Sequence, residues 1–509
     1  MFTAPEIDYL AFLPLIIVFA GGLVGCLVEG FAGRGQRYAI QLPLTVGTLV
    51  LALVALVTVS RDHTGITAAG ALVTDDPALV IQGLVLALAL TGVMVMGERL
   101  GGATPDAFTQ AGVSIPGSQE EALATKLGAT TTEIFPLTLL SVGGMMLFPA
   151  ANDLMVMFIA LEVLSLPLYV LCGLARRRRL LSQEASLKYF MLGSFSSAFF
   201  LFGAVLLYGY AGSMRLDVIA DTVATGVGME GLLAPGILLL SVGLLFKVGA
   251  VPFHAWTPDV YQGAPTPVTG FMAACTKVAA FGAMLRIFYV AVEGARLDWQ
   301  PVLAAVAALS MVVGAVMSIQ QTDIKRILAY SSIAHAGFIL AGLIALEQTG
   351  ASSTMFYLMA YGFMTIPAFA LVTLVRTAGS EATHITQWSG LAQRSPWLAG
   401  AFAFLLLAFA GIPLTSGFTG KFAVFTAAVD GGYWWLAVVG VLASAVTAYI
   451  YFKLIMVMYF GDESVGTHVV RPSWLTTFAV VAGLAITLGL GVAPSPLLEL
   501  AEGAATFLR

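Results

Sequence analysis

Five ionisable residues lie inside long apolar runs of the sequence: Glu162, Lys247, Lys277, His335 and Lys421. A lysine or aspartate at the centre of a membrane helix costs about 2.5–3.5 kcal/mol on insertion scales. Several such charges would be costly together unless they faced one another or water inside the protein. We therefore expect these side chains to point toward the interior.

These residue types together are suited to moving protons. Burial weakens the hold of a lysine on its proton, and a nearby carboxylate strengthens it, so a lysine between both effects can exchange a proton when its partner moves. Glu162 is the only acid deep in an apolar run, which makes it the natural partner of Lys247. Histidine titrates near neutrality and can bridge two sites. The set favours a proton relay over a metal cage, because a protonated lysine cannot bind a cation.

Other basic residues have a structural interpretation at least as good as a functional one. Lys453 and Arg286 are nearer the ends of their runs, where a long side chain can reach the membrane surface or be satisfied by backbone carbonyls. His254, just past Pro252, is a further relay candidate, with packing as the equal alternative. His335 taken alone is as readily explained as a structural hydrogen-bonding residue.

The composition is that of a polytopic α-helical membrane protein. Of the 509 residues, 59% are hydrophobic and 10% charged, whereas soluble domains have roughly 45–50% and about 25%. The apolar runs are continuous rather than alternating, which favours helices over strands. The three cysteines are isolated, so we expect no disulfide framework and no metal or iron–sulfur site. The first run is long for a signal-peptide core and is interpreted as a retained helix.

About fourteen spans are expected, an even number that puts both termini on one side. They cover residues 9–29, 39–59, 78–97, 134–150, 153–174, 185–210, 233–253, 264–291, 300–320, 325–346, 353–376, 397–428, 433–460 and 473–494. Lysine and arginine gather in alternate loops, which the positive-inside rule assigns to the cytoplasm. These residues are Arg34, Arg37, Arg99, Lys126, Arg176, Arg177, Arg178, Arg179, Lys188, Lys325, Arg326, Arg376, Arg394 and Arg471. The other loops and the tail hold only Arg61, Arg215, Arg296 and Arg509, so both termini are predicted outside.

Two of the spans are interrupted by helix-breaking residues. The seventh carries Lys247 just before Pro252, and the twelfth carries Gly411 and Pro413 before Lys421. The two lie five spans apart, so the units that contain them have opposite orientations. Interrupted segments at corresponding positions of inverted halves indicate a transport site.

Three loop features are interpreted without catalysis. Residues 98–133 are rich in small polar residues and predict a flexible cytoplasmic insertion. The GxGxxG pattern at 226–231 has no preceding strand, and Gly420-Lys421 lacks the rest of a phosphate loop, so neither predicts a nucleotide site. The four arginines at 176–179 are interpreted as a topology anchor rather than as a site for nucleic acid or anionic lipid.

Four longer motifs resemble a known family. They are KVGAVPFHAWTPDVYQGAPTPVTGF (247–271), EASLKYFMLGSFSSAFFLFG (184–203), TDIKRILAYSSIAHAGF (322–338) and AGIPLTSGFTGKF (410–422). They resemble the antiporter-like membrane subunits of respiratory complex I over roughly residues 134–460. Within these, the wording is most similar to the subunit N group of NADH-quinone oxidoreductases, the bacterial counterparts of mitochondrial NADH dehydrogenase subunit 2. Lys421 matches the lysine of this group, where subunit M has a glutamate.

The resemblance implies a fold and a division of the chain. It implies two inverted five-helix repeats with discontinuous helices 7 and 12. The expected segments are a three-helix part at 1–97, the loop at 98–133, the repeats at 134–291 and 300–460, and a last helix at 473–494. It also assigns Glu162 with Lys247 as a pair, Lys277 as the central lysine, His335 as the histidine of span ten and Lys421 as the exit-side lysine.

The resemblance also implies a function: proton translocation coupled to electron transfer from NADH to quinone, in a bacterial cell membrane. This chain would hold no redox cofactor and no metal, with FMN and iron–sulfur clusters in partner subunits. The implied partners are the antiporter-like subunit M, the side of the small subunits K and J, and lipids, but no nucleic acid. Two alternatives stay open: a proton-translocating subunit of a multi-subunit Na⁺/H⁺ antiporter or membrane-bound hydrogenase, and a passive scaffold whose charges only lock helices together.

Overall fold

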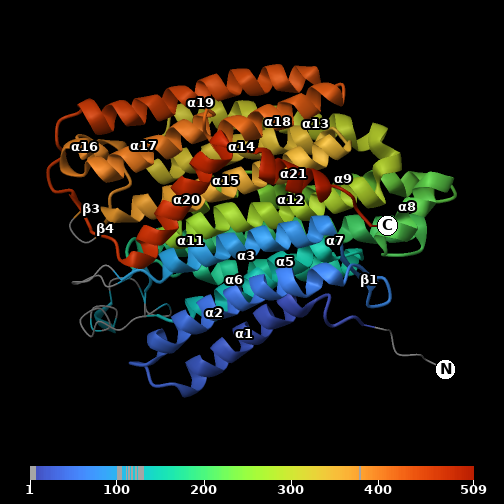
Figure 1. The fold of residues 1–509 in the computed structure, drawn as a ribbon, viewed down its shortest axis with the longest axis horizontal. Coiled ribbons are helices and arrows are strands. Elements are labelled where there is room, and N and C mark those ends of the chain that lie inside the picture. Colours follow the sequence, from blue (N-terminus) through green and yellow to red (C-terminus); the bar gives the residue numbers. More distant parts are fainter. Residues whose placement is uncertain are drawn as a thin grey trace.

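The structure is a computed structural model, and it describes residues 7–99, 106–109, 112, 115, 118–120, 123, 131–377 and 380–508. The chain is a bundle of helices that lie side by side along most of its length (Figure 1). Most of the loop at 98–133, including Lys126, and also Arg509 lie outside the described residues. One described stretch of that loop is packed, since Phe108 is buried and pairs with Ala175, whereas Ile115 and Leu123 are exposed.

The first half of the chain forms helices in the connection order expected from its apolar runs. They are α1 (Leu13–Phe31), α2 (Arg37–Thr58), α3 (Asp76–Met96), α5 (Ile134–Ala150), α6 (Leu154–Cys172), α7 (Arg179–Ala211), α8 (Leu216–Thr225), α9 (Glu230–Val248), α10 (Trp256–Gly263), α11 (Thr266–Phe271) and α12 (Lys277–Arg286). Two π-helical turns flank α12, at η2 (Met272–Thr276) and η3 (Ile287–Ala291).

The second half repeats this alternation of long and broken helices. It comprises α13 (Arg296–Ile319), α14 (Ile324–Ile344), α15 (Gln348–Leu374), α16 (Leu391–Arg394), α17 (Pro396–Ala410), α18 (Ser416–Asp430), α19 (Trp434–Phe460), α20 (Trp474–Val492) and α21 (Ser495–Gly503). Short 3-10 turns lie at η1 (Ser60–Asp62), η4 (Glu293–Ala295) and η5 (Ile385–Trp388).

Within the described residues, twelve helices are long and apolar enough to cross a membrane. The expected number of about fourteen is therefore not confirmed. Two expected spans are the difference: α5 has 17 residues, and the run at 397–428 divides into α17 and α18 with 15 residues each. The expected breaks in spans seven and twelve are confirmed, because α9 ends before Gly249 and α17 ends before Gly411, both with positive φ.

Several spans begin at a side chain that accepts a hydrogen bond from the first turn. Asp75 accepts from the Ala78 amide at the start of α3, and Asp153 accepts from the Met155 and Val156 amides at the start of α6. Such caps satisfy amides that have no partner inside the helix. These polar residues thus fix where the apolar spans start.

Burial divides the helices into an outer layer and a centre. The outer helices α1, α2, α7 and α19 expose large apolar side chains, as expected for contact with lipid. In the most apolar stretch of the span Thr266–Ala291 and in that of α14, every residue is buried. In the corresponding stretch of α15, 94% of the residues are buried. Ionisable residues on these central helices therefore face protein rather than lipid.

Short strands occur only in the connections of the described chain. β1 (Gly65–Thr67) pairs antiparallel with β2 (Leu72–Thr74). β3 (Val375–Thr377) pairs antiparallel with both β4 (Ser380–Glu381) and β5 (His468–Val469). The sheet of β3 and β4 lies at the opposite end of the bundle from β1 and α8 (Figure 1).

Both described ends of the chain lie at the β1 end of the bundle. The Asp8 amide donates to Thr67 Oγ1 at 3.0 Å, and the Leu508 amide donates to Asp75 Oδ2 at 3.1 Å. The expectation that the termini share one side agrees with this arrangement (Figure 1). The assignment of that side to the outside stays a prediction.

Arg286 is satisfied inside the protein rather than at a membrane surface. It is fully buried, its Nε donates to the Pro149 carbonyl at 2.6 Å, and its Nη2 donates to Asp75 Oδ1, a partner that was not predicted. Asp75 is the cap of α3, and Arg286 ends α12, so the pair joins two helices far apart in sequence. The partner acid lies outside the apolar runs, which is why the spacing did not reveal it.

We predict that Asp75→Asn strongly destabilises the protein. The amide can still cap α3, but Arg286 is left as an unpaired buried charge, and breaking a buried pair in this way costs about 3–5 kcal/mol. Thermal unfolding of the purified assembly measures the loss. Asp76→Asn is the matched control, because that neighbouring carboxylate is exposed and forms no ion pair in the described chain. Equal stability of the two variants would contradict the prediction.

Candidate functional site: buried lysines at helix breaks

Lys247 lies in the last turn of α9, directly before the break at Gly249. Its Nζ donates to Ser165 Oγ on α6 at 2.6 Å. The rings of Tyr169 and Tyr189 lie about the ammonium, each centroid 5.5 Å from Nζ, and aromatic faces attract cations. Ser165 was not anticipated from the sequence, because a serine in an apolar helix carries no signal of its own.

Glu162 lies one helical turn before Ser165 on α6, on the same face. It acts electrostatically on Lys247, but the two form no direct ion pair among the described residues. Its Oε1 is buried and has no hydrogen-bond partner there. The structure thus brings the predicted pair close, with Ser165 rather than Glu162 in contact with Lys247.

Lys277 is the first residue of α12 and follows the π-helical turn η2. Its Nζ donates to the Ser332 carbonyl of α14 and lies 5.0 Å from the centroid of the Tyr361 ring. The Tyr361 hydroxyl donates to Ser332 Oγ at 2.8 Å. Wide turns of this kind occur often at functional sites, and this one was not predicted from the sequence.

His335 lies one turn beyond Ser332 on α14 and is buried. Its Nδ1 shares a hydrogen bond of 2.8 Å with the Tyr357 hydroxyl of α15. Its ring packs against those of Tyr361 and Phe409, with centroids 5.2 and 5.5 Å away. The two tyrosines were also missed, since aromatic residues in apolar runs are usually packing residues.

Lys421 lies on α18 but reaches back to the end of α17. Its Nζ donates to the carbonyls of Phe409 and Ala410, each at 2.9 Å. These are the last carbonyls before the break at Gly411, where the helix dipole is negative and favours a cation. A Cβ at Gly411 would also come within 3.0 Å of Lys421 Cδ, so the glycine gives the lysine its room.

The four basic residues of the predicted site are too deeply buried for any side chain to reach a surface. Their exposed fractions are 3% for Lys247, 2% for Lys277, 1% for His335 and 5% for Lys421. Each lysine is held by uncharged oxygen atoms, which tolerate both the protonated and the neutral amine. This arrangement can bind and release protons, and it shows no group of three or more candidate metal ligands among the described residues.

The predicted residues form two groups rather than one continuous chain. One group is Lys277, His335 and Lys421, whose polar atoms lie on or beside α14 and α15. The other is Glu162 on α6 and Lys247 on α9. No unbroken series of hydrogen bonds joins the groups within the described residues. His254 is half-buried in the break after α9, and its Nδ1 has no hydrogen-bond partner among the described residues. Lys453 lies exposed on α19.

The side chain of Asp259 joins helices that belong to the two groups. It lies on α10, beyond the break, and accepts from Lys188 of α7 and Arg326 of α14, each at 2.7 Å. Partial burial raises the pKa of Asp259, but the hydrogen bonds from Lys188 and Arg326 outweigh it and hold the pKa below its usual value. Asp259 therefore ties the helix that carries His335 to the one that follows Lys247.

Comparison with known proteins agrees with this architecture. Residues 151–447 match the family described as NADH:quinone oxidoreductase/Mrp antiporter, TM. One chain of respiratory complex I from Thermus thermophilus superposes with a TM-score of 0.77 at 35% identity, covering 96% of this chain and 99% of that one. One chain of the Mrp complex from Dietzia sp. DQ12-45-1b shares the fold, with a TM-score of 0.80 at 22% identity over 98% and 97% of the two chains. Fold and site together define an antiporter-like membrane subunit.

Within that class, sequence identity then distinguishes NADH-quinone oxidoreductase subunits from Mrp antiporter subunits. NADH-quinone oxidoreductase subunit N from Rhodococcus opacus is 54% identical over 526 residues, covering 99% of this chain and 97% of its own length. The chain belongs to the NADH-quinone oxidoreductase subunit N family. It is an integral multi-pass subunit of a hetero-oligomeric membrane complex. The resemblance found in the sequence motifs is confirmed, and the antiporter and hydrogenase alternative gives way.

We predict that Asp259→Asn lowers thermal stability modestly at neutral pH, by about 0–1 kcal/mol for each exposed pair lost. Because the pKa of Asp259 is lowered in the folded state, its contribution is present above the ordinary value of 3.8 and disappears as pH falls through the folded value. Melting curves of the purified assembly from neutral to acid pH measure this. Glu184→Gln, which removes only one exposed partner of Lys188, is the control. A difference from wild type that persists in acid would refute the assignment.

Proposed function

We propose that this subunit carries protons across the membrane through Glu162, Lys247, Lys277, His335 and Lys421 while the complex transfers electrons from NADH to quinone. The main support is the burial of three lysines, each held only by neutral oxygens. An ammonium so placed is costly to retain as a fixed charge, but it can serve as a reversible proton carrier.

The polar contacts of the buried lysines suggest how protons pass from one residue to the next. Movement of Glu162 toward or away from Lys247 changes how tightly that lysine holds its proton, with Ser165 as the hydroxyl between their helices. The second group offers a series of polar atoms from Lys277 through Ser332 and Tyr361 toward His335. Lys421, at the second break, is the exit-side carrier of the proposal.

The remaining parts of the proposal concern context. The repeats at 134–291 and 300–460 each contain one broken helix and its lysine, flanked by the parts at 1–97, 98–133 and 473–494. The termini face the outside of a bacterial plasma membrane, and the arginine-rich loops face the cytoplasm. FMN, iron–sulfur clusters and the quinone site belong to other subunits, with subunit M and the side of subunits K and J as neighbours.

The test is a Lys277→Met variant of the intact complex in inverted membrane vesicles. We expect the complex to assemble, and the protons taken up per NADH oxidised to fall by the share that this chain carries. Lys277 loses one hydrogen bond to a carbonyl and the contact of its charge with the Tyr361 ring, and no ion pair with a described residue, so assembly should survive. Proton uptake is followed with a pH-sensitive dye, NADH oxidation by absorbance, and assembly on native gels.

Lys453→Met is the matched control, because it removes a lysine from an exposed position of α19. It should leave proton uptake unchanged. If Lys277→Met pumps with the full stoichiometry, the relay is wrong. If activity falls only in step with lost assembly, for Lys277→Met and Lys247→Ala alike, the charges serve as a scaffold.

A further inference from the structure

A small pocket lies at the arginine-rich end of the bundle, and none of the residues of the proposed relay lines it. Its wall is formed by the connection between α6 and α7, the connection between α10 and α11, and the hairpin of β3 and β4. Its volume is about 50 Å³. A single water requires roughly 10–15 Å³ by the same measure, so the pocket has room for a group of a few heavy atoms.

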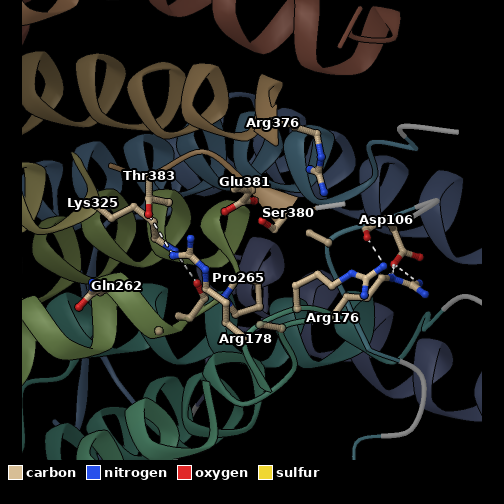
Figure 2. Close-up of a pocket in the computed structure, with 15 residues that line it drawn as sticks. Asp106, Arg176, Arg178, Gln262, Pro265, Lys325, Arg376, Ser380, Glu381 and Thr383 are labelled. Carbon is tan, nitrogen blue, oxygen red and sulfur yellow. Dashed lines mark hydrogen bonds and ion pairs between the residues drawn. The ribbon is translucent and has the colours of Figure 1, made fainter. Parts of the chain in front are cut away.

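The charges around the pocket are mainly positive. Arg177, Arg178, Arg376 and Lys325 line it, together with Arg176, whose charge is already matched by Asp106. Glu381 is the other acid of the wall, and its Oε2 accepts a hydrogen bond from Thr266. Figure 2 shows Arg178 and the Arg176–Asp106 pair on the wall, with Arg376 above them. Counting one charge for each side chain, five cations face two acids.

Two of these guanidinium groups have N–H donors without a hydrogen-bond partner in the described chain. Arg376 is only 6% exposed, and its one hydrogen bond in the described chain is a long contact of 3.4 Å to the Thr373 carbonyl of its own turn. Arg177 is exposed and forms no hydrogen bond or ion pair with any described residue. Neither is matched by a carboxylate of the described chain at ion-pair distance.

The electrostatics of Arg376 point the same way. Burial lowers its pKa most, Glu381 raises it in part, and the charge of Arg177 lowers it to a smaller extent. A buried cation beside a second cation is stabilised by an anion placed between them. The polar side chains Ser380 and Thr383 line the same pocket, and Arg178 Nη1 donates to Thr383 Oγ1 at 3.0 Å.

We propose that this pocket binds a phosphate group through Arg177 and Arg376. A phosphate fits better than a carboxylate, because its larger number of acceptor oxygens can serve guanidinium groups on two separate connections at once, and guanidinium groups pair well with it. The phosphate can come from the headgroup of an anionic phospholipid or from a soluble phosphate compound. When bound, it joins the loop after α6 to the hairpin after α15, and so links the two halves of the chain. The site is independent of the proposed proton relay.

Arg177→Gln and Arg376→Gln in the purified complex provide the test. Arg34→Gln is the control, because Arg34 is an exposed arginine with no hydrogen bond or ion pair in the described chain and does not line the pocket. Inorganic phosphate is titrated into detergent-washed complex, and its binding is followed by the rise in melting temperature. In parallel, complex in nanodiscs of phosphatidylglycerol is analysed by native mass spectrometry for retained phospholipid.

We expect either pocket variant to weaken phosphate-group binding about tenfold, as for the loss of one charge-assisted hydrogen bond. Loss of phosphate stabilisation alone assigns a soluble ligand, and loss of retained phosphatidylglycerol assigns a headgroup. Should Arg376→Gln fail to assemble, Arg177→Gln decides, because the exposed Arg177 side chain has no hydrogen bond or ion pair with a described residue to lose. The proposal is overturned if both readouts stay at wild-type values in Arg177→Gln, or if Arg34→Gln changes them equally.

Discussion

The cost of placing a lysine away from water is the constraint on which this structure depends. Each buried lysine of the site needs an oxygen atom that can share its proton without fixing its charge. A helix end supplies such oxygens because its last carbonyls have no amide partner within the helix. Along an unbroken helix the oxygen is a side-chain hydroxyl, as for Lys247, or a carbonyl shared with the helix, as for Lys277. Two of the three lysines also lie beside a helix break. At Lys421 the last two carbonyls of α17 face the ammonium, and at Lys247 the break lies two residues beyond the lysine.

The central helix α14 gathers the rest of the site around these breaks. It presents the Ser332 carbonyl to Lys277 and His335 to Tyr357, and it packs against α13, α15, α18 and α10. Because α14 is buried along its length, every polar group on it has to find a partner within the protein. The same helix begins at Asp323, whose side chain accepts from the Arg326 amide, and Arg326 in turn holds Asp259. The hydrogen bonds at the start of α14 and the site residues in its buried middle are therefore carried by the same helix.

Sequence reasoning recovered the features that follow from local chemistry. Apolar length located the spans, and the glycine and proline residues near Lys247 and Lys421 located the breaks. The buried positions of Lys277 and His335 followed from their apolar neighbours. The partners of these residues could not be predicted, because Ser165, Tyr357 and Tyr361 are ordinary residues of apolar helices. The ion pair of Arg286 was missed for the related reason that Asp75 becomes its partner only through tertiary packing.

The wide turns on either side of α12 determine how the central lysine is aimed. An α-helix rotates about 100° for each residue, and a π-helical turn accommodates one residue more than a regular turn. Lys277 begins α12 directly after one such turn, and Arg286 ends it directly before another. The helical segment between them is therefore set at its own angle, out of phase with the helix on either side. The direction in which the central lysine points is thus encoded in the number of residues before it, and a shortening by one residue would turn it away with every side chain otherwise intact.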